Sequence, residues 1–339
     1  RQGWHGILAV DPSDPASIEQ FTKPLDRRGV RAIDRFGGTM LHSSRTNPGS
    51  VRESDVPAGM DVSDYPLNER GRRDLTPIVQ RNLDALGVDS LVVTGGDDTL
   101  GYAARLSEAG FPVTGVPKTM DNDVTGTDYC LGFSTAVTRS VDLIHQLRTP
   151  AGSHERISVV ELFGRNSGAT GLYVGLLAAA DRVLIPESPF DTEAVAHKLC
   201  EDQDRSPSGY SICVVSEGAH PVGGEIFQSG KEDAYGHKKL GGIGDWLADQ
   251  IKTITGRATL TQKLAYLMRS GSPDSLDRIV GLAYGSMAYE FLEAGKSGLM
   301  TALVDGKYKG VPLASVSAGA RPADIDSYYD VQEYRPHLE

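Results

Sequence analysis

The sequence predicts an α/β fold with two parallel sheets, and three observations support this prediction. From about residue 75 onward, short β-branched runs alternate with glycine-rich corners and amphipathic helices, which is the pattern of βαβ units. The 339 residues are long enough to bury two cores of ordinary size. The number of strand-like runs also suits two sheets.

The elements are expected to follow one another regularly after an irregular start. The first 60 residues contain five prolines, and only residues 7–10 and 30–33 resemble strands. A helix is expected from Thr76, as its N-cap, with Pro77 in the first turn, to Gly87. Further strands are expected at residues 90–93, 113–116, 157–162, 182–185, 211–216 and 259–266, and further helices around residues 97–110, 135–148, 168–180, 192–203, 241–253 and 275–294. The polar stretch 223–239 is expected to form a loop or a small insertion.

The strand at residues 90–93 ends in Gly95-Gly96-Asp97-Asp98-Thr99, and a helix follows. This places an acidic pair at the carboxyl end of a strand, where open α/β sheets bind their ligands. Glycines let a phosphate approach the backbone, a helix N-terminus attracts anions, and a carboxylate can hold Mg²⁺. Taken alone, the motif fits a surface turn equally well.

A second motif, Pro117-Lys118-Thr119-Met120-Asp121-Asn122-Asp123, directly follows the strand at 113–116. Carboxyl ends of neighbouring parallel strands meet at one edge of a sheet, so both motifs are expected there. A solvated loop whose Asp and Asn side chains satisfy their own turn is the structural alternative. The density of ionisable side chains favours a functional site.

The composition excludes some classes of function. The net charge of −11 disfavours a nucleic-acid-binding or acidic-membrane surface, so an anionic ligand must meet a local cluster of Arg and Lys. Cys130, Cys200 and Cys213 stand singly, without metal-ligand spacing, and indicate a reducing cytoplasm. The longest apolar run, 171–180, is too short to span a membrane. We expect no leader or membrane anchor.

The two motifs together resemble the phosphofructokinase family, and the resemblance extends from about Gly3 to about Pro312. Further matching segments are Gly37-Gly38-Thr39, Ser44-Arg45-Thr46-Asn47-Pro48, residues 153–161, Gly164-Arg165, Pro186-Glu187, Ser216-Glu217-Gly218, residues 268–273 and Asp277-Arg278. The resemblance implies two Rossmann-like parallel-sheet domains with the active site in the cleft between them. It implies a larger donor-binding domain of residues 1–132 and 268–315, and a smaller sugar-phosphate-binding domain of residues 133–267 and 316–339.

The resemblance also assigns roles for phosphoryl transfer to the 1-hydroxyl of fructose 6-phosphate. Asp121 and Arg165 are the implied catalytic residues, with Asp121 as the general base that accepts the hydroxyl proton. Asp97 is the implied ligand of Mg²⁺, with Asp123 as a weaker candidate, and Arg45 holds the transferred phosphoryl group. The implied substrate-binding residues are Thr119, Met120, Arg156, Phe163, Gly164, Arg165, Glu217, Tyr266, Leu267, Met268 and Arg269. Arg156 resembles a residue donated across a subunit interface, which implies a homodimer or homotetramer.

The residues that set donor specificity point to pyrophosphate. ATP-using relatives typically carry glycine after the Gly-Gly-Asp, whereas Asp98 stands here. Its carboxylate adds bulk and negative charge where a third phosphate would lie, and like charges about 4 Å apart repel by several kcal/mol at modest screening. Lys118 is the complementary residue, although some ATP-dependent members carry it too. The predicted partners are therefore fructose 6-phosphate and pyrophosphate, in a reversible reaction.

Three alternatives remain open: an ATP-dependent 6-phosphofructokinase, another kinase with a similar glycine loop acting on a dinucleotide or a lipid, and a catalytically silent subunit. Family members begin with a strand and a Gly-Gly-Asp-x-Pro-Gly loop, and this sequence begins after that position. The chain as written is therefore expected to lack one interior strand and one phosphate-binding loop. Tyr266 stands where histidine is usual, and Phe163 where methionine is commoner. The longer spacing from Arg257 to Arg269 leaves the role of Arg257 open.

Overall fold

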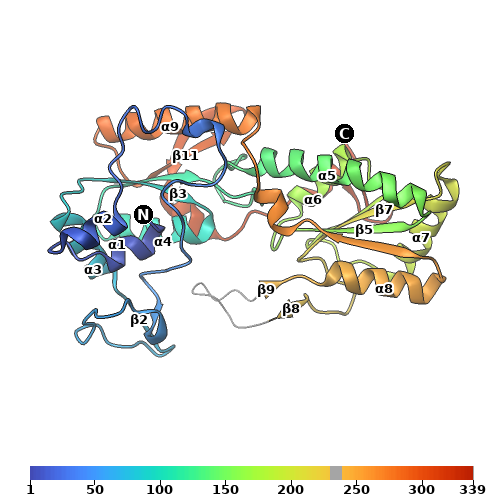
Figure 1. The fold of residues 1–339 in the computed structure, drawn as a ribbon, viewed down its shortest axis with the longest axis horizontal. Coiled ribbons are helices and arrows are strands. Elements are labelled where there is room, and N and C mark those ends of the chain that lie inside the picture. The colour runs from blue at the N-terminus through green and yellow to red at the C-terminus, as the bar shows by residue number, and fades with distance from the viewer. Residues whose placement is uncertain (230–238, 339) are drawn as a thin grey trace.

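Two four-stranded sheets form the centres of two lobes that lie side by side (Figure 1). The computed structural model describes residues 1–229 and 239–338. The first sheet has the order β12-β11-β4-β3, with β3 (Leu91–Gly95), β4 (Val113–Pro117) and β11 (Leu299–Val304) parallel and β12 (Lys307–Pro312) antiparallel to β11. The second sheet has the order β10-β5-β7-β6 and is parallel throughout, with β5 (Ile157–Leu162), β6 (Arg182–Leu184), β7 (Ser211–Ser216) and β10 (Thr259–Lys263). The predicted α/β fold with two parallel sheets is confirmed.

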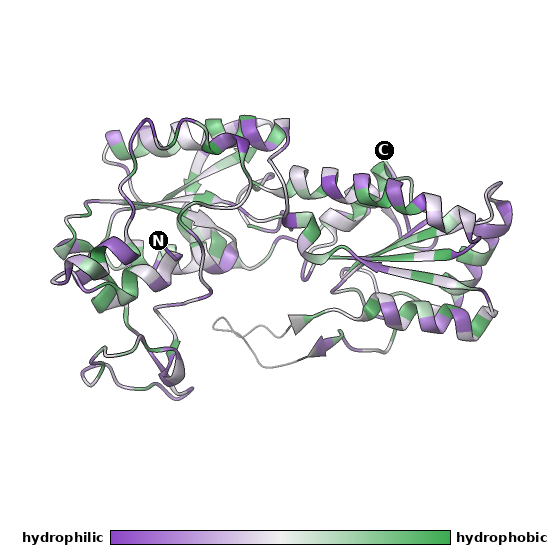
Figure 2. Ribbon diagram, in the orientation of Figure 1, coloured by the Kyte–Doolittle hydropathy of each residue, from purple (hydrophilic) through white to green (hydrophobic). Residues whose placement is uncertain are grey.

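Helices cover the sheets, and the buried hydrophobic residues form two clusters: the first core lies within the first lobe, and the second core fills the second lobe and extends to β4 and α9. The first lobe contains α1 (Gly3–Ala9), α2 (Pro15–Phe21), α3 (Thr76–Ala85), α4 (Asp97–Glu108) and α9 (Ser275–Glu293). In the second lobe, α5 (Phe133–Ser153) and α6 (Ala169–Leu177) cover one face of the sheet, and α7 (Thr192–Arg205) packs beside α8 (Ile243–Thr255). Every residue of β5 and β7 is buried. Hydrophobic residues predominate along β5 and β7 (Figure 2), as is typical of parallel strands that are covered on both faces.

Short elements complete the described chain. They are β1 (Val51–Arg52), β2 (Arg72–Arg73), β8 (Gln228–Ser229), β9 (Lys239–Leu240), β13 (Tyr329–Asp330), β14 (Arg335–Pro336) and α10 (Ile325–Tyr328), with 3₁₀ helices η1 (Ile33–Arg35), η2 (Glu53–Asp55), η3 (Ala265–Arg269) and η4 (Leu313–Ala318). Residues 228–229 pair with 239–240 as antiparallel strands, so the expected loop 223–239 contains strand pairing at its end. Residues 230–238 of that expected loop lie outside the described residues. In the part of the chain that the structure describes, no helix has the length and apolarity needed to cross a bilayer.

The strand predicted at residues 7–10 is wrong, because residues 7–9 belong to α1. Trp4 and Leu8 lie one helical turn apart and are both buried in the first core. Asn82 of α3 donates to the main-chain oxygens of Ile7, Leu8 and Val10 at 3.0–3.3 Å, which satisfies the carbonyl groups at the end of this helix. This cap comes from a residue more than seventy positions away.

Three other local predictions also need correction. Residues 30–32 form turns and Ile33 begins η1, so no strand is present there. Thr76 is not an N-cap, since it is the first residue of α3 and its N–H and hydroxyl both donate to Asp74. The strand expected to reach Tyr266 ends at Lys263, where the Leu264 N–H makes the last ladder bond to the Glu161 carbonyl at 3.0 Å, and η3 begins at Ala265. The strands β11 and β12 were not predicted.

Candidate active site

The two acidic motifs lie side by side at the carboxyl edge of the first sheet. The parallel register pairs Gly95 with Pro117, and the Lys118 N–H donates to the Gly95 carbonyl at 2.8 Å. Asp97 and Asp98 are the first two residues of α4, where the helix N-terminus stabilises carboxylates. The structure thus brings together the two segments that the sequence singled out.

The segment that carries Asp121, residues 118–128, is called here the base loop. The Asp121 N–H donates to Thr119 Oγ1 at 3.2 Å. Asn122 has a φ of +52°, and its side chain accepts from the Cys130 N–H at 2.8 Å and donates to the Asp128 carbonyl at 3.1 Å. These hydrogen bonds of the Asn122 side chain fix the conformation of the base loop, and with it the positions of the neighbouring residues Asp121 and Asp123.

Asp121 is half-buried, and the burial of one of its two carboxylate oxygens suits a proton acceptor. Its Oδ1 is buried and has no hydrogen-bond partner within residues 1–229 and 239–338. Burial raises the pKa of the Asp121 carboxyl, the cations Arg269, Arg165 and Lys118 act in the opposite direction, and Asp97 raises it further. A carboxylate with a raised pKa is a stronger base, so Asp121 has the chemistry to take a proton from an alcohol.

The second lobe contributes loops at the carboxyl ends of β5 and β7. Phe163, Gly164 and Arg165 follow β5, and Glu217 follows β7. The Gly218 N–H donates to the Gly164 carbonyl at 3.1 Å, and a Cβ on Gly218 would lie 2.1 Å from the Arg165 carbonyl oxygen. Only glycine at position 218 allows the two loops to approach this closely.

Arg269 of η3 is held against two aromatic rings. Its guanidinium carbon lies 4.7 Å from the centroid of Phe163 and 5.7 Å from that of Tyr266, and the two rings are edge to face at 5.6 Å. Arg269 Nε lies 3.2 Å from Met120 Sδ, so this cation from the second lobe touches the base loop. Stacked arginines of this kind suit phosphate recognition because their fork of donors stays oriented.

The charged groups of the two lobes are close enough to shift one another's pKa values. Burial and then the Asp121 charge raise the pKa of Glu217 to about 7. Burial, Asp121 and Asp97 raise the pKa of Asp123 to about 7, with Asp98 contributing last. Although the Lys118 side chain reaches solvent, protein atoms around its ammonium lower its pKa, Arg269 lowers it further, and Asp121 raises it. Carboxylates and cations from both lobes therefore lie close enough to influence one another's protonation.

The raised pKa of Glu217 gives a stability prediction. A carboxyl whose pKa is about 7 when folded and 4.5 when unfolded destabilises the folded protein increasingly as pH rises through this window. Glu217→Gln removes the buried charge, so this variant is expected to be more stable than the parent by about 1–3 kcal/mol at about pH 8.5. Most of that gain disappears at about pH 5. Urea unfolding at both pH values measures it, and an equal gain at both would contradict the explanation.

The carboxylates fit a magnesium ion that arrives with a phosphate ligand. Asp97, Asp98, Asp121 and Asp123 are close enough for their charges to disfavour one another, and a divalent cation held by Asp97 would relieve this repulsion. Among the described residues, no three His, Cys, Asp or Glu side chains converge to hold a metal by themselves. Mg²⁺ typically takes one or two carboxylates together with substrate phosphates and water, which this arrangement permits.

Several residues that the sequence predicted for the site lie away from the carboxyl ends of the strands or are buried in the second core. Arg156 precedes β5, so it lies at the opposite end of this strand from Phe163, about 20 Å away at the usual rise per residue. Met120 and Met268 are buried in the second core, whereas Tyr266 and Leu267 are exposed. Arg257 precedes β10 and pairs with Asp204 of α7 at 2.9 Å, also away from the carboxyl edge of the sheet.

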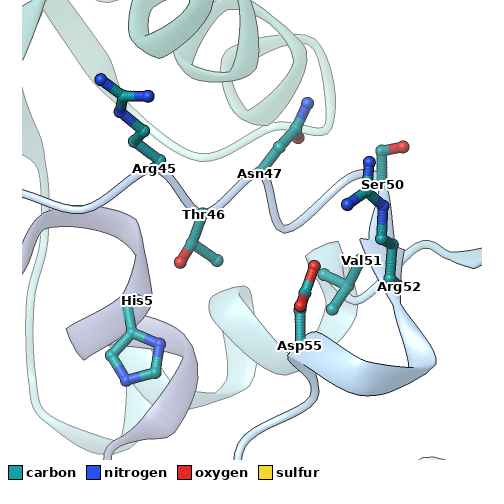
Figure 3. A pocket seen from close by; sticks show the side chains of 8 residues that line it. All are labelled: His5, Arg45, Thr46, Asn47, Ser50, Val51, Arg52 and Asp55. Atoms are coloured by element: carbon teal, nitrogen blue, oxygen red, sulfur yellow. The ribbon is translucent and has the colours of Figure 1, made fainter. Parts of the chain in front are cut away.

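Arg45 lies in the first lobe beside a pocket of about 390 Å³ (Figure 3). The pocket is lined by His5, Arg45, Thr46, Asn47, Ser50, Val51, Arg52 and Asp55. In Figure 3 the Arg45 guanidinium points away from His5 and Asp55. The structure therefore places Arg45 on the first lobe, and its predicted role on the phosphoryl group stays a prediction.

Three residues that support the site were missed as functional candidates. Glu161 accepts from the N–H groups of Gly242 and Gly244 at 2.8–3.3 Å and so caps α8. Glu187 and Arg321 contact the loops that carry Arg165 and Asp121. The available signal for Glu187 was the Pro186-Glu187 motif in the sequence. The available signal for Glu161 was a carboxylate near the end of a mostly apolar strand. The sequence around Arg321 holds no such signal.

Comparisons with known proteins give a consistent result. A family model described as Phosphofructokinase matches residues 1–292. A pyrophosphate–fructose 6-phosphate 1-phosphotransferase of Streptomyces coelicolor is 39% identical over 334 residues, covering 98% of this chain and 88% of that protein. An ATP-dependent 6-phosphofructokinase 3 of the same organism is 35% identical and covers 93% of this chain and 83% of that protein. The crystal structure of a pyrophosphate-dependent phosphofructokinase from Marinobacter aquaeolei is 20% identical, with a TM-score of 0.74 over 99% of this chain and 79% of that one.

Proposed function

This chain belongs to the phosphofructokinase family, and we propose that it transfers a phosphoryl group from pyrophosphate to the 1-hydroxyl of fructose 6-phosphate, giving fructose 1,6-bisphosphate and phosphate. The observation that carries the proposal is the buried Asp121 carboxylate, which shares one electrostatic environment with Asp97 of the first lobe and with Arg165 and Arg269 of the second. This transfer needs a base placed between carboxylates that hold the magnesium-bound donor and cations that hold the sugar phosphate.

The proposed reaction begins with Asp121 accepting the proton of the sugar 1-hydroxyl. The sugar oxygen then bonds to one phosphorus of pyrophosphate, and the bond from that phosphorus to the bridging oxygen breaks, so inorganic phosphate leaves. Arg165 stabilises the charge that develops on the transferred group, and Lys118 that on the departing phosphate. Mg²⁺, carried with pyrophosphate and held by Asp97, would neutralise donor charge. Because cleavage of the phosphoanhydride of pyrophosphate releases less free energy than cleavage of that of ATP, we expect the reaction to run in both directions.

On the acceptor side, we assign the sugar phosphate to the second lobe. Arg269 and Glu217 are the principal contacts, with Thr119, Phe163, Gly164 and Tyr266 lining the sugar. Arg156 lies far from this group within one chain, which suits a role in the site of a second copy and thus a homodimer or homotetramer. We also propose that donor and acceptor domains divide at residues 132 and 267, with 268–315 in the former and 316–339 in the latter. The helix η3 crosses the boundary at residue 267 and places Arg269 against Phe163 of the acceptor domain. We also propose a cytoplasmic location, because the cysteines Cys130, Cys200 and Cys213 are free thiols, which suit a reducing compartment.

Pyrophosphate as the donor is supported by Asp98. It stands beside Asp97 in the first turn of α4, and its charge reaches Asp123. A nucleotide would bring further phosphate charge against these carboxylates, which costs about 4 kcal/mol per close pair at intermediate dielectric. The relatives named as pyrophosphate-dependent, 36–39% identical, agree with this assignment. The ATP-dependent relatives at 35–37% identity favour ATP as the second candidate donor.

A coupled assay that supplies fructose 6-phosphate, Mg²⁺ and either donor tests the proposal. We expect turnover with pyrophosphate and at least about a hundredfold lower kcat/KM with ATP, the ratio that about 2.7 kcal/mol of repulsion gives. Turnover with ATP alone would overturn the donor assignment, and turnover with neither would overturn the proposed function.

The double variant Asp98→Gly, Lys118→Gly is expected to widen the donor site. Removing the carboxylate lowers repulsion, and removing the lysine shortens a side chain over the donor, so ATP should bind with a dissociation constant at least about tenfold lower than for the parent. Calorimetric titration with Mg-ATP measures this affinity. The matched control is Asp84→Gly, Lys296→Gly, which removes the same residue types from exposed positions far from the motifs. No gain in ATP binding by the first pair would contradict the charge and size argument.

A further inference from the structure

The segment of residues 319–323, called here the crossing segment, joins the two lobes and contacts the base loop on its way. It follows η4, whose Leu313 and Val316 are buried in the first core. It precedes α10 and β13, where Tyr329 is buried in the second core and donates its hydroxyl to the Val183 carbonyl at 2.6 Å. The crossing segment is therefore fastened at both ends.

The crossing segment lies along the base loop and bonds to it repeatedly. Thr125 Oγ1 donates to the Gly319 carbonyl at 2.6 Å, Val124 and Ala320 form an isolated antiparallel bridge, and the Arg321 N–H donates to the Asp123 carbonyl at 2.6 Å. These contacts are made by the main chain of the crossing segment, so they fix the position of Arg321 before its side chain is considered.

The Arg321 guanidinium then closes the base loop from the same side. Its Nη2 donates to the Asn122 carbonyl at 3.2 Å and to the Asp128 carbonyl at 3.1 Å, and its Nη1 lies 3.5 Å from Asp128 Oδ1. A charged donor that joins two main-chain carbonyls of one loop stabilises that loop more than a surface ion pair would.

The peptide that Arg321 holds is a strained one. Asn122 has a φ of +52° and stands between Asp121 and Asp123. A residue other than glycine keeps such a conformation only where surrounding contacts over-determine it. The carbonyl that Arg321 holds belongs to the Asn122–Asp123 peptide, and the preceding peptide joins Asn122 to Asp121, so the backbone conformation of Asn122 sets the direction of the Asp121 side chain.

At its other end the crossing segment reaches the loop that carries Arg165. The Ala323 N–H donates to Glu187 Oε1 at 2.7 Å, and the Glu187 carboxylate also accepts from the Gly168 N–H at 2.9 and 3.0 Å. Gly168 is the N-cap of α6 and lies three residues after Arg165. The same short segment thus contacts the elements that carry the base and the opposing cation.

We propose that Arg321 is a positioning residue for phosphoryl transfer: by holding the Asn122 peptide, it aims the Asp121 carboxylate at the acceptor hydroxyl. This inference rests on the proposed function of Asp121. Arg321 touches neither donor nor acceptor in this account, so its loss affects the chemical step rather than substrate binding. Displacements of about 1 Å at a reacting group can cost a hundredfold in rate.

The test compares Arg321→Met with Arg335→Met. Arg335 belongs to the same C-terminal region, donates to the Asp181 carbonyl at 3.0 Å and pairs with Asp202 at 2.8 Å, but contacts the second lobe alone among the described residues. Arg321→Met is expected to lower kcat about tenfold or more while both KM values stay within about twofold, and Arg335→Met to leave kcat unchanged. Guanidinium ion at low millimolar concentration should restore part of the lost rate in Arg321→Met alone.

Amide hydrogen exchange supplies a readout that does not depend on activity. Amides of residues 121–128 are expected to exchange faster in Arg321→Met than in the parent or in Arg335→Met. An unchanged kcat in Arg321→Met, or an equal loss in Arg335→Met, would overturn the inference. If the parent turns over neither donor, the proposed function fails, and exchange alone decides whether Arg321 holds the loop: faster exchange confined to Arg321→Met supports it, and identical exchange overturns it.

Discussion

Asp121→Asn is expected to lower kcat by about 10²–10⁴-fold, the usual contribution of a general base. The amide keeps the size of the side chain but cannot accept the hydroxyl proton. KM for fructose 6-phosphate should change little, because binding of the sugar phosphate is assigned to Arg269 and Glu217. The variant should also be more stable than the parent at neutral pH, since burial raises the pKa of Asp121 and a buried charge is lost. Steady-state kinetics over a range of pH measures the first effect.

The pH profile separates loss of the base from general damage. In the parent, kcat should fall on the acid side as Asp121 is protonated, and Asp121→Asn should lose this limb. Asp84→Asn, on the exposed face of α3, is the matched control and should behave as the parent. An Asp121→Asn variant that keeps more than about a tenth of the parent kcat would refute the role of Asp121.

Arg269→Met is the second change with a large expected effect. The guanidinium lies against Phe163 and Tyr266 and uses its Nε on Met120 Sδ, so its two Nη groups are the donors that we assign to a phosphate. Loss of charge-assisted hydrogen bonds worth about 1.5–3 kcal/mol should raise KM for fructose 6-phosphate by about 10–150-fold. Arg269→Lys should recover only part of the affinity, because an ammonium has no planar fork to stack.

Controls for Arg269 are available on the surface. Arg205→Met removes an arginine whose side chain is 73% exposed and pairs with Glu201 one turn away, so KM should not change. The KM for pyrophosphate in Arg269→Met should stay close to that of the parent, since the donor is assigned to the other lobe. An equal rise in the KM for fructose 6-phosphate and in the KM for pyrophosphate would contradict the assignment of Arg269 to the acceptor.

The sequence was sufficient where a local pattern encodes the structure. Apolar runs and glycine corners predicted β3, β4, β5, β6 and β7, and the position of Asp97 and Asp121 after two neighbouring strands predicted that their loops meet. Parallel register makes this inference possible, because it aligns the carboxyl ends of strands that are separate in sequence.

Contacts between distant residues could not be predicted in this way. Residues 7–9 form a helix because Asn82 caps it and α3 covers it, and neither partner is visible in the local pattern. Arg321 bonds to the Asn122 carbonyl across 199 residues, and an arginine between Ala320 and Pro322 has no periodic signal. The strand at 259–263 ended earlier than predicted because η3 follows it, where Arg269 lies against Phe163 and Met268 is buried in the second core. Each of these errors comes from tertiary structure that overrides local preference.

Phosphorus NMR of a mixture of this protein with Mg²⁺, fructose 6-phosphate and pyrophosphate tests the central claim most directly. We expect the pyrophosphate signal to decrease as signals of fructose 1,6-bisphosphate and phosphate grow in equal amounts, and the reverse change when the mixture starts from the bisphosphate and phosphate. Hydrolysis of pyrophosphate without a new sugar phosphate, or a bisphosphate that forms only after ATP is added, would contradict the account.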